Sequence, residues 1–238
     1  MLLVSEVLES TVTQAEIEHL ANTLEGADPL EILRVIKERV PNVALACSFG
    51  SEDMALIDMW MKVDPEGSVF YIDTDVLFSE TYALRDRTVA KYGLPNLIQV
   101  NSRLSLADQA QQYGDKLWAR DPNECCFLRK VEPLERALAS FDGWITGIRR
   151  DQAPTRANAK VVEWDQKFRL VKVNPLASWT SDDVWDYIRA NDVPYNPLHD
   201  QGYPSIGCMH CTKPVKPGED PRSGRWAGFE KTECGLHK

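Results

Sequence analysis

The sequence has no long hydrophobic run: none of its apolar stretches approaches the roughly 20 residues that a membrane-spanning helix needs. The first nine residues contain two glutamates and no lysine or arginine, which is unlike a signal peptide, so we expect a cytoplasmic protein. Internal repeats and low-complexity segments are absent as well. Positive charge is scarce, because 27 Lys and Arg face 36 Asp and Glu, and the net charge of −9 argues against nucleic-acid binding.

What is present is the composition of an ordinary globular protein, 43% hydrophobic and 26% charged, in a chain of 238 residues that can bury a substantial core. The stretch 192–238 differs from the rest, since it holds six prolines and six glycines and shows little periodicity. We therefore expect three parts: an N-terminal helical segment over 1–40, an α/β domain over 41–191, and a loop-rich C-terminal region over 192–238 that is integral to the same domain.

Short apolar segments with strand character alternate with helical segments along the chain. Strands are predicted at 42–47, 68–72, 97–100 and 144–146, and helices at 53–62, 80–92, 104–113, 130–140 and 181–191. This alternation predicts an α/β fold with a doubly wound, mostly parallel sheet. The segment 161–173 breaks the rhythm and predicts a hairpin at the sheet edge. The segment 12–40 predicts two helices, the second with Asp28 as its N-cap, and Ser181 is the predicted cap of the last helix.

A polar turn, Ser48-Phe49-Gly50-Ser51, follows the first predicted strand and opens a helix. Gly50 allows the backbone to approach an anion, the hydroxyls of Ser48 and Ser51 can donate hydrogen bonds, and a helix N-terminus adds amide donors and partial positive charge. The turn lacks the lysine of a G-x-x-x-x-G-K-[ST] loop and resembles the shorter phosphate loop of the adenine-nucleotide alpha hydrolase-like family. An ordinary strand-to-helix turn is the alternative.

Asp73 and Thr74 end the second predicted strand. Because ligands of open α/β sheets bind at the carboxyl ends of the strands, we expect these two residues beside the serine turn, in contact with a nucleotide. Capping of the next helix by Ser79 and its neighbours is the alternative. With both features, 41–191 is predicted to be a nucleotide-binding domain.

Four cysteines have ligand-like spacing, Cys125-Cys126 and Cys208-x-x-Cys211. Adjacent side chains diverge, which suits a single tetrahedral zinc ion badly. An iron–sulfur cubane spreads its thiolates over four irons, so that adjacent cysteines can each bind a different iron. The spacing favours a 4Fe–4S cluster, with zinc and unligated thiols as alternatives. Cys47, at the end of an apolar strand, is predicted to be a core residue.

The sixth cysteine, Cys234, lies near the C-terminus with Lys231 and His237 close by in the sequence. Nearby cations favour the thiolate form of a cysteine. A thiol on a tail that moves can reach both a buried substrate and an external partner. Cys234 is therefore a candidate nucleophile, and a stray surface thiol is the alternative.

Several stretches carry a resemblance to a known family. They are Cys47–Asp53, Asp73-Thr74, Leu77–Tyr82, Gly147–Gln152, Asn174–Leu176, Val193–His199, Gly202–Cys208, Gly218–Asp220, Arg222, Gly224–Trp226 and Lys231–His237, the last of which contains Glu-Cys-Gly-Leu-His. In these stretches, over about residues 43–238, the chain resembles the phosphoadenylyl-sulfate reductase family and, within it, the assimilatory adenylyl-sulfate reductases.

The resemblance implies a cofactor and a substrate. In this family the cysteine pairs that match Cys125-Cys126 and Cys208-x-x-Cys211 hold one 4Fe–4S cluster. Members that act on adenylyl sulfate generally keep all four cysteines, so adenylyl sulfate is the expected substrate. Asp75 stands where many relatives have glycine, and an acid there is expected to repel a 3′-phosphate.

The resemblance also implies a mechanism. The thiolate of Cys234 attacks the sulfur of adenylyl sulfate, AMP leaves, and an S-sulfocysteine forms on the enzyme. Thioredoxin, or a glutaredoxin-like donor, then releases sulfite, a step of sulfate assimilation toward cysteine. This is covalent catalysis that divides one difficult displacement into two. The sequence does not fix the oligomeric state, and a homo-oligomer, either a dimer or a tetramer, is compatible with it.

A doubly charged substrate needs cations around it. The candidates share positions near predicted strand ends, the cysteine pair or the tail, and they are Lys130, Arg149, Arg150, Arg222, Arg225 and His237. Arginine pairs suit tetrahedral oxyanions because their donors are forked. A surface salt bridge is the alternative for each of them.

Three other functions fit parts of the pattern. The first is reduction of the 3′-phosphorylated nucleotide, alone or beside adenylyl sulfate. The second is a sulfur-transfer or tRNA-thiolating enzyme that uses ATP at the same phosphate turn. The third, from a non-enzyme class, is a binding module stabilised by zinc.

Overall fold

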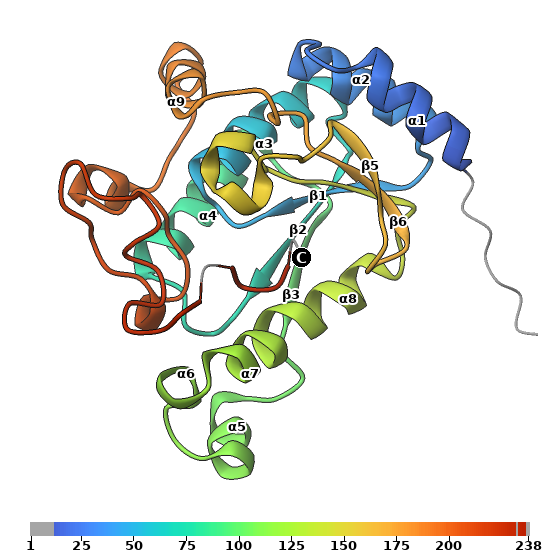
Figure 1. Cartoon of the computed structure of the whole chain (residues 1–238). Coiled ribbons are helices and arrows are strands. Elements are labelled where there is room, and N and C mark those ends of the chain that lie inside the picture. Colours follow the sequence, from blue (N-terminus) through green and yellow to red (C-terminus); the bar gives the residue numbers. More distant parts are fainter. Residues whose placement is uncertain (1–11, 232, 237–238) are drawn as a thin grey trace, which may run out of the picture.

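The structure, a computed structural model, describes residues 12–231 and 233–236 (Figure 1). Its centre is a six-stranded sheet with the order β3-β2-β1-β4-β6-β5. The strands are β1 (Val43–Cys47), β2 (Ser68–Asp73), β3 (Leu97–Asn101), β4 (Gly143–Ile145), β5 (Val162–Asp165) and β6 (Leu170–Val173). All neighbours pair in parallel except β5, which is antiparallel to β6 at the edge. The predicted sheet and its edge hairpin are confirmed.

Helices cover both faces of the sheet (Figure 1). The larger helices are α1 (Gln14–Thr23), α2 (Pro29–Arg39), α3 (Ser51–Val63), α4 (Ser79–Tyr92), α5 (Leu106–Tyr113), α8 (Glu132–Leu138) and α9 (Ser181–Ala190). Leu45 of β1 belongs to the larger core, which contains α3, whereas its neighbour Ala44 belongs to a smaller core with Leu134 of α8. Successive strand residues point to opposite faces, so α3 and α8 lie on opposite sides of the sheet.

The helix ends show which signals in the sequence were correct. Asp28 caps α2 as predicted, with its carboxylate accepting from the backbone N–H of Leu30. The cap of α9 is Thr180 rather than Ser181, because Thr180 and Asp183 form a reciprocal capping box that makes Ser181 the first helical residue. Two short helices, α6 (Leu117–Arg120) and α7 (Pro122–Cys126), were not predicted. They are too short to show a helical period.

The strand order creates a crevice between β1 and β4. After β1 the chain moves to β2 on one side, whereas β4 and β6 lie on the other side, so the connections diverge from this point. Such a topological switch point is where open α/β sheets bind ligands. The loop-rich segment 192–231 lies at the same end of the sheet (Figure 1), and residues 233–236, which we call the tail, lie against the strands, where Leu236 packs on the smaller core. Among the described residues, no helix is long and apolar enough to cross a membrane.

Candidate active site

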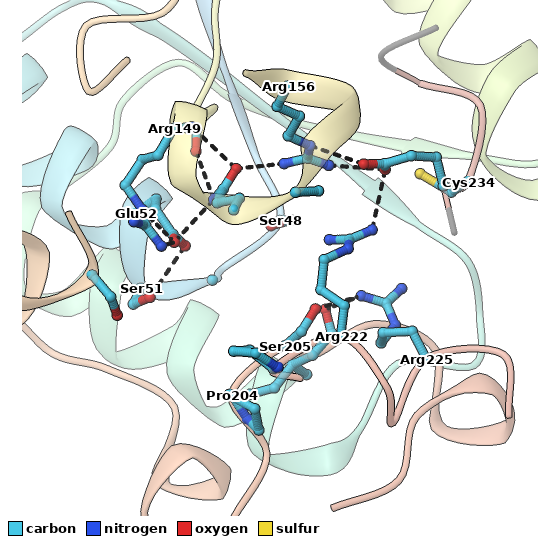
Figure 2. A pocket seen from close by; sticks show the side chains of 18 of the residues that line it. Ser48, Ser51, Glu52, Arg149, Arg156, Pro204, Ser205, Arg222, Arg225 and Cys234 are labelled. Atoms are coloured by element: carbon cyan, nitrogen blue, oxygen red, sulfur yellow. Dashed lines mark hydrogen bonds and ion pairs between the residues drawn. The ribbon is translucent and has the colours of Figure 1, made fainter. Parts of the chain in front are cut away.

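A cavity of about 1320 Å³ lies at the carboxyl ends of β1 and β4. Its lining comes from several parts of the chain, among them the serine turn with the start of α3, the segment 147–156 that follows β4, helix α9, and the C-terminal loops with the tail. Figure 2 shows side chains of the serine turn, of the segment 147–156 and of the C-terminal region pointing into the same space. Residues far apart in the sequence therefore share one site.

The serine turn opens α3 toward the cavity. Ser48, Gly50 and Ser51 all line it, and Gly50 is the N-cap of α3 without a side-chain hydrogen bond at that position. The first amides of a 13-residue helix thus lie at the cavity edge. Exposed amide donors and the helix dipole make this end of α3 suited to a phosphate or sulfate group.

Asp53 holds the turn in place from within α3. Its Oδ2 accepts hydrogen bonds from the backbone N and the hydroxyl of Ser48, both at 2.6 Å. The end of β4 passes so close that a Cβ on Gly147 would meet Asp53 Oδ1 at 2.4 Å, so only glycine fits there. Burial raises the pKa of Asp53 to about 6, despite the two hydrogen bonds from Ser48.

Arg149 lines the cavity but is already paired. Its guanidinium contacts the carboxylate of Glu52 at 3.0 Å and also pairs with Asp151. Gln152 donates to the same Glu52 oxygen at 3.0 Å. Burial alone would raise the pKa of Glu52, but Arg149 and Gln152 outweigh it and hold the pKa below its usual value. Arg149 therefore organises the wall of the cavity more than it offers free charge.

Arg222 and Arg225 come from the C-terminal loops. Arg225 donates to Ser205 Oγ at 3.0 Å and stacks on the ring of Trp226 at 4.6 Å. Its Nε is buried and finds no hydrogen-bond partner within the described part of the chain. Arg225 lines the cavity, where the forked donors of a guanidinium suit an oxyanion. Arg222 contacts Glu233 at 3.1 Å.

Cys234 lies in this cavity, half-buried, with Lys130 among the other lining residues (Figure 2). Burial would lower the pKa of Lys130, but the sulfur atoms of Cys208 and Cys234 outweigh it and raise that pKa. Lys130 also lines a second, much smaller cavity of about 30 Å³. It therefore lies between the two sites.

The second cavity is lined by all four paired cysteines, Cys125, Cys126, Cys208 and Cys211. The first two end α7 and precede a π-helical turn, Phe127–Val131, an irregularity often found at functional sites. None of the four is in a disulfide. Cys208 pairs by a β-bridge with Leu77, which fixes the C-x-x-C segment beside the end of β2.

The four thiols, all among the described residues, do not form a site for a single metal ion. Within residues 12–231 and 233–236, no three His, Cys, Asp or Glu side chains form a group that could hold a metal ion. Burial, followed by the charges of Cys126, Cys208 and Cys211, raises the pKa of Cys125 to about 12. Four thiolates in such a space need cationic compensation, and the donor set fits a cofactor that spreads its ligands apart.

Other predicted residues lie outside the main cavity. Asp73 accepts from the Tyr82 hydroxyl at 2.7 Å and from Gln99 at 3.1 Å, and does not line the cavity. The hydroxyl of Thr74 lies 3.4 Å from Cys208 Sγ, beside the thiols rather than beside the serine turn. Arg150 forms a forked pair with Glu25 and is not a lining residue. His237 falls outside the described residues.

Asp75 does not lie at the substrate cavity, where the sequence predicted an acid that would repel a 3′-phosphate. Its carboxylate pairs with the buried guanidinium of Arg129 at 2.8 Å, and Arg129 lines the cysteine cavity. Asp75 itself is absent from the lining of the main cavity. The expectation that this acid repels a 3′-phosphate of the substrate therefore has no support in the geometry.

Arg156, Glu52 and Glu233 line the cavity but were not predicted as site residues from the sequence. Arg156 lines the main cavity and follows Arg149 and Arg150 on the same segment. The signal was its position beyond the same strand end, but only the fold of two short 3-10 turns, Arg150–Gln152 and Pro154–Arg156, decides which arginine faces inward.

We expect the raised pKa of Asp53 to appear in the pH dependence of folding. Because the folded pKa lies above the unfolded value, protonation favours the folded state, and this stabilisation is lost as the pH rises through about 6. The side chain of Asn does not ionise, so the variant Asp53→Asn does not lose this stabilisation. The unfolding free energy of Asp53→Asn minus that of wild type should therefore rise by about 1 kcal/mol between about pH 5.5 and about pH 7.5. Urea unfolding at both pH values measures this, and Asp115→Asn, at an exposed position, is the control. An equal difference at both pH values would contradict it.

Comparisons with known proteins agree with this geometry. Residues 42–214 match the family described as phosphoadenosine phosphosulfate reductase domain. A protein of Lysinibacillus sphaericus, named adenosine 5'-phosphosulfate reductase, is 51% identical over 88% of this chain and 90% of that protein. A protein of Gloeobacter violaceus, named phosphoadenosine 5'-phosphosulfate reductase, is 48% identical over 95% of each chain.

A solved structure gives the same result. The crystal structure of phosphoadenylyl-sulfate reductase from Candida auris, a phosphate complex, is 34% identical with a TM-score of 0.76, over 85% of this chain and 98% of that chain. The α/β fold class and the family resemblance predicted from the sequence are both confirmed. The chain belongs to the phosphoadenosine phosphosulfate reductase family.

Proposed function

We propose that this protein reduces adenylyl sulfate to sulfite and AMP. The observation that carries the proposal is the position of Cys234 in one cavity with Lys130, Arg222, Arg225 and the N-terminus of α3. Adenylyl sulfate carries one phosphate and one sulfate group and therefore two negative charges. Guanidinium and ammonium groups on one side and helix amides on the other suit these two groups.

The reaction follows from the thiol. The Cys234 sulfur bonds to the sulfur of the sulfate group as the bond from that sulfur to the bridging oxygen breaks, and AMP leaves with the bonding electrons. The sulfonate group stays on the enzyme, bonded to the sulfur of Cys234 as an S-sulfocysteine. A dithiol donor then attacks the Cys234 sulfur, sulfite leaves, and the donor becomes a disulfide as its second thiol returns Cys234 to the free form.

Two of the cavity cations have a place in this scheme. Arg225, which lines the cavity, and Lys130, whose charge acts on Cys234, would neutralise the oxygens of the sulfate group. The amides at the start of α3 would receive the phosphate, which becomes the charged leaving group. His237 remains a candidate from the sequence alone.

We propose that Cys125, Cys126, Cys208 and Cys211 hold one 4Fe–4S cluster. Their shared cavity supports one common cofactor, and the adjacent pair Cys125-Cys126 favours a cluster over zinc. When bound, the cluster supplies a local charge and ties the C-terminal loops to α7. The thiol reaction transfers two electrons between sulfur atoms and does not need an electron relay.

We expect the donor to be thioredoxin or a glutaredoxin-like protein, and we expect the reaction to take place in the cytoplasm, where such thiols stay reduced. Relatives of similar identity carry names for both nucleotides, adenosine 5'-phosphosulfate and its phosphorylated form. We favour adenylyl sulfate because all four cysteines are present. Activity on the 3′-phosphorylated nucleotide, alone or in addition, is the alternative that the Gloeobacter relative supports.

Replacing Cys234 tests the chemistry. Cys234→Ser should form no covalent sulfo-adduct with sulfur-labelled adenylyl sulfate, because serine is a much poorer nucleophile toward sulfur, while nucleotide binding is retained. Intact-protein mass spectrometry and AMP binding by calorimetry measure the two properties. Cys47→Ser, a change in the core outside the cavity lining, should keep the adduct. A full yield of adduct in Cys234→Ser would refute the proposal.

Substrate preference is settled by kinetics with both nucleotides. We expect kcat/KM for adenylyl sulfate to exceed that for the 3′-phosphorylated form by about tenfold or more, which is about 1.4 kcal/mol of transition-state binding. Initial rates at matched concentrations, with the same thioredoxin, give the ratio. A ratio near one would indicate dual activity, and a ratio well below one would establish the alternative.

The cluster has its own test. Anaerobically purified protein should be brown, with visible absorption and about four iron atoms per chain, and Cys126→Ser should lose both. Iron assay and absorption spectra measure this, with Cys47→Ala as the matched control that keeps the iron. A colourless protein that holds one zinc ion would contradict the assignment.

A further inference from the structure

Glu233, the residue before Cys234, is buried in an ionic contact. Its side chain is only 4% exposed, and Arg156 and Arg222, which contact it, are 11% and 19% exposed. Arg156 approaches as a fork, with Nε donating to Oε1 and Nη2 to Oε2, both at 2.9 Å. Arg222 donates to Oε2 at 3.1 Å, and Thr155 donates to Oε1 at 3.3 Å. Figure 2 shows Arg156, Arg222 and Cys234 around the same part of the cavity.

The contact between Glu233 and Arg156 is a buried, forked ion pair. Forked pairs between arginine and carboxylate are among the stronger hydrogen-bonded contacts in proteins, and burial reduces their screening by salt. Burial would raise the pKa of Glu233, but Arg156 and Arg222 outweigh it and lower that pKa. The carboxylate is therefore charged in this arrangement, and loss of that charge would leave the buried Arg156 without its carboxylate partner, which is costly.

The other contacts of the tail are weaker or more exposed. Lys231 donates to Asn123 at 2.6 Å, and Lys167 donates to the carbonyl of Gly235 at 2.9 Å, both in exposed surroundings. Leu236 packs at the border of the smaller core, where it is partly buried. The ionic contact of Glu233 is thus the most buried polar contact among these, and it belongs to the residue next to the thiol.

We propose that the ion pair of Glu233 with Arg156 and Arg222 holds the tail in the cavity and thereby positions Cys234 there. We call this ion pair the latch. The proposal rests on the proposed function, in which the thiol must enter the cavity to attack the substrate and leave it to meet a protein donor. An ion pair suits this task because both partners can be hydrated when the tail leaves. Glu233 is in this sense a positioning residue, which acts through Cys234 and takes no part in bond making.

The test measures docking of the tail without any turnover. Resting holoenzyme is treated anaerobically with iodoacetamide, and labelling of Cys234 is followed in the tryptic peptide 232–238, which contains no other cysteine. The variants are Glu233→Gln, Glu233→Asp and Arg156→Gln. Glu230→Gln, an exposed glutamate of the same segment, is the matched control.

We expect Cys234 to be labelled about tenfold faster in Glu233→Gln than in wild type, because about this factor corresponds to the loss of one charged hydrogen bond. The rate in Glu233→Asp should lie between the two. Arg156→Gln separates docking from simple electrostatics. Removing a cation makes the thiolate less favourable and would slow labelling, whereas opening the latch speeds it. Faster labelling in both Glu233→Gln and Arg156→Gln, with Glu230→Gln unchanged, is the expected result.

A second readout connects the latch to catalysis. At saturating labelled adenylyl sulfate, the single-turnover rate of adduct formation should fall in Glu233→Gln, with partial rescue in Glu233→Asp and an unchanged cluster spectrum. Labelling rates equal to wild type in Glu233→Gln, or slower labelling in Arg156→Gln, would overturn the latch. If wild type itself forms no adduct on Cys234, the proposed function fails, and the labelling experiment still decides on the latch.

Discussion

The active site depends on compensating the partly buried positive charges around one cavity. These cations need anionic partners. Moving a charge out of water costs several kcal/mol unless a partner compensates it. Arg149 is compensated by Glu52, and Arg156 and Arg222 share Glu233. A chain with a net charge of −9 thus gathers cations at one place, where an anionic substrate and an acidic residue of the tail can both balance them.

The fold brings these charges together through the order of its strands. The crevice between β1 and β4 is lined by the start of α3 on one side and by the segment after β4 on the other. Gly147 allows this segment to pass against Asp53, which in turn holds Ser48. The cysteine cavity shares Lys130 and Trp226 with the larger one, so the proposed cofactor site and the proposed substrate site have a common wall.

Local patterns predicted much of this. The apolar strands, the hairpin at the edge and the cap of α2 each depend on neighbours in sequence, which is why they were predicted correctly. The roles of single charged side chains were harder, because Arg150 and Arg156 lie on the same segment and only one of them faces the cavity. Asp75 shows the same limit: its partner, Arg129, is 54 residues away.

Patterns within the chain were enough to predict the class of sheet and to divide the cysteines into two pairs, a core residue and a tail thiol, because periodicity and spacing are properties of short segments. The family was predicted from a resemblance carried by particular stretches of residues, and the comparisons confirm it. The fold alone places Thr74 beside Cys208, pairs Arg149 with Glu52, and buries Glu233 between two arginines. Such contacts join segments tens of residues apart, and their strength depends on burial, which no local pattern contains.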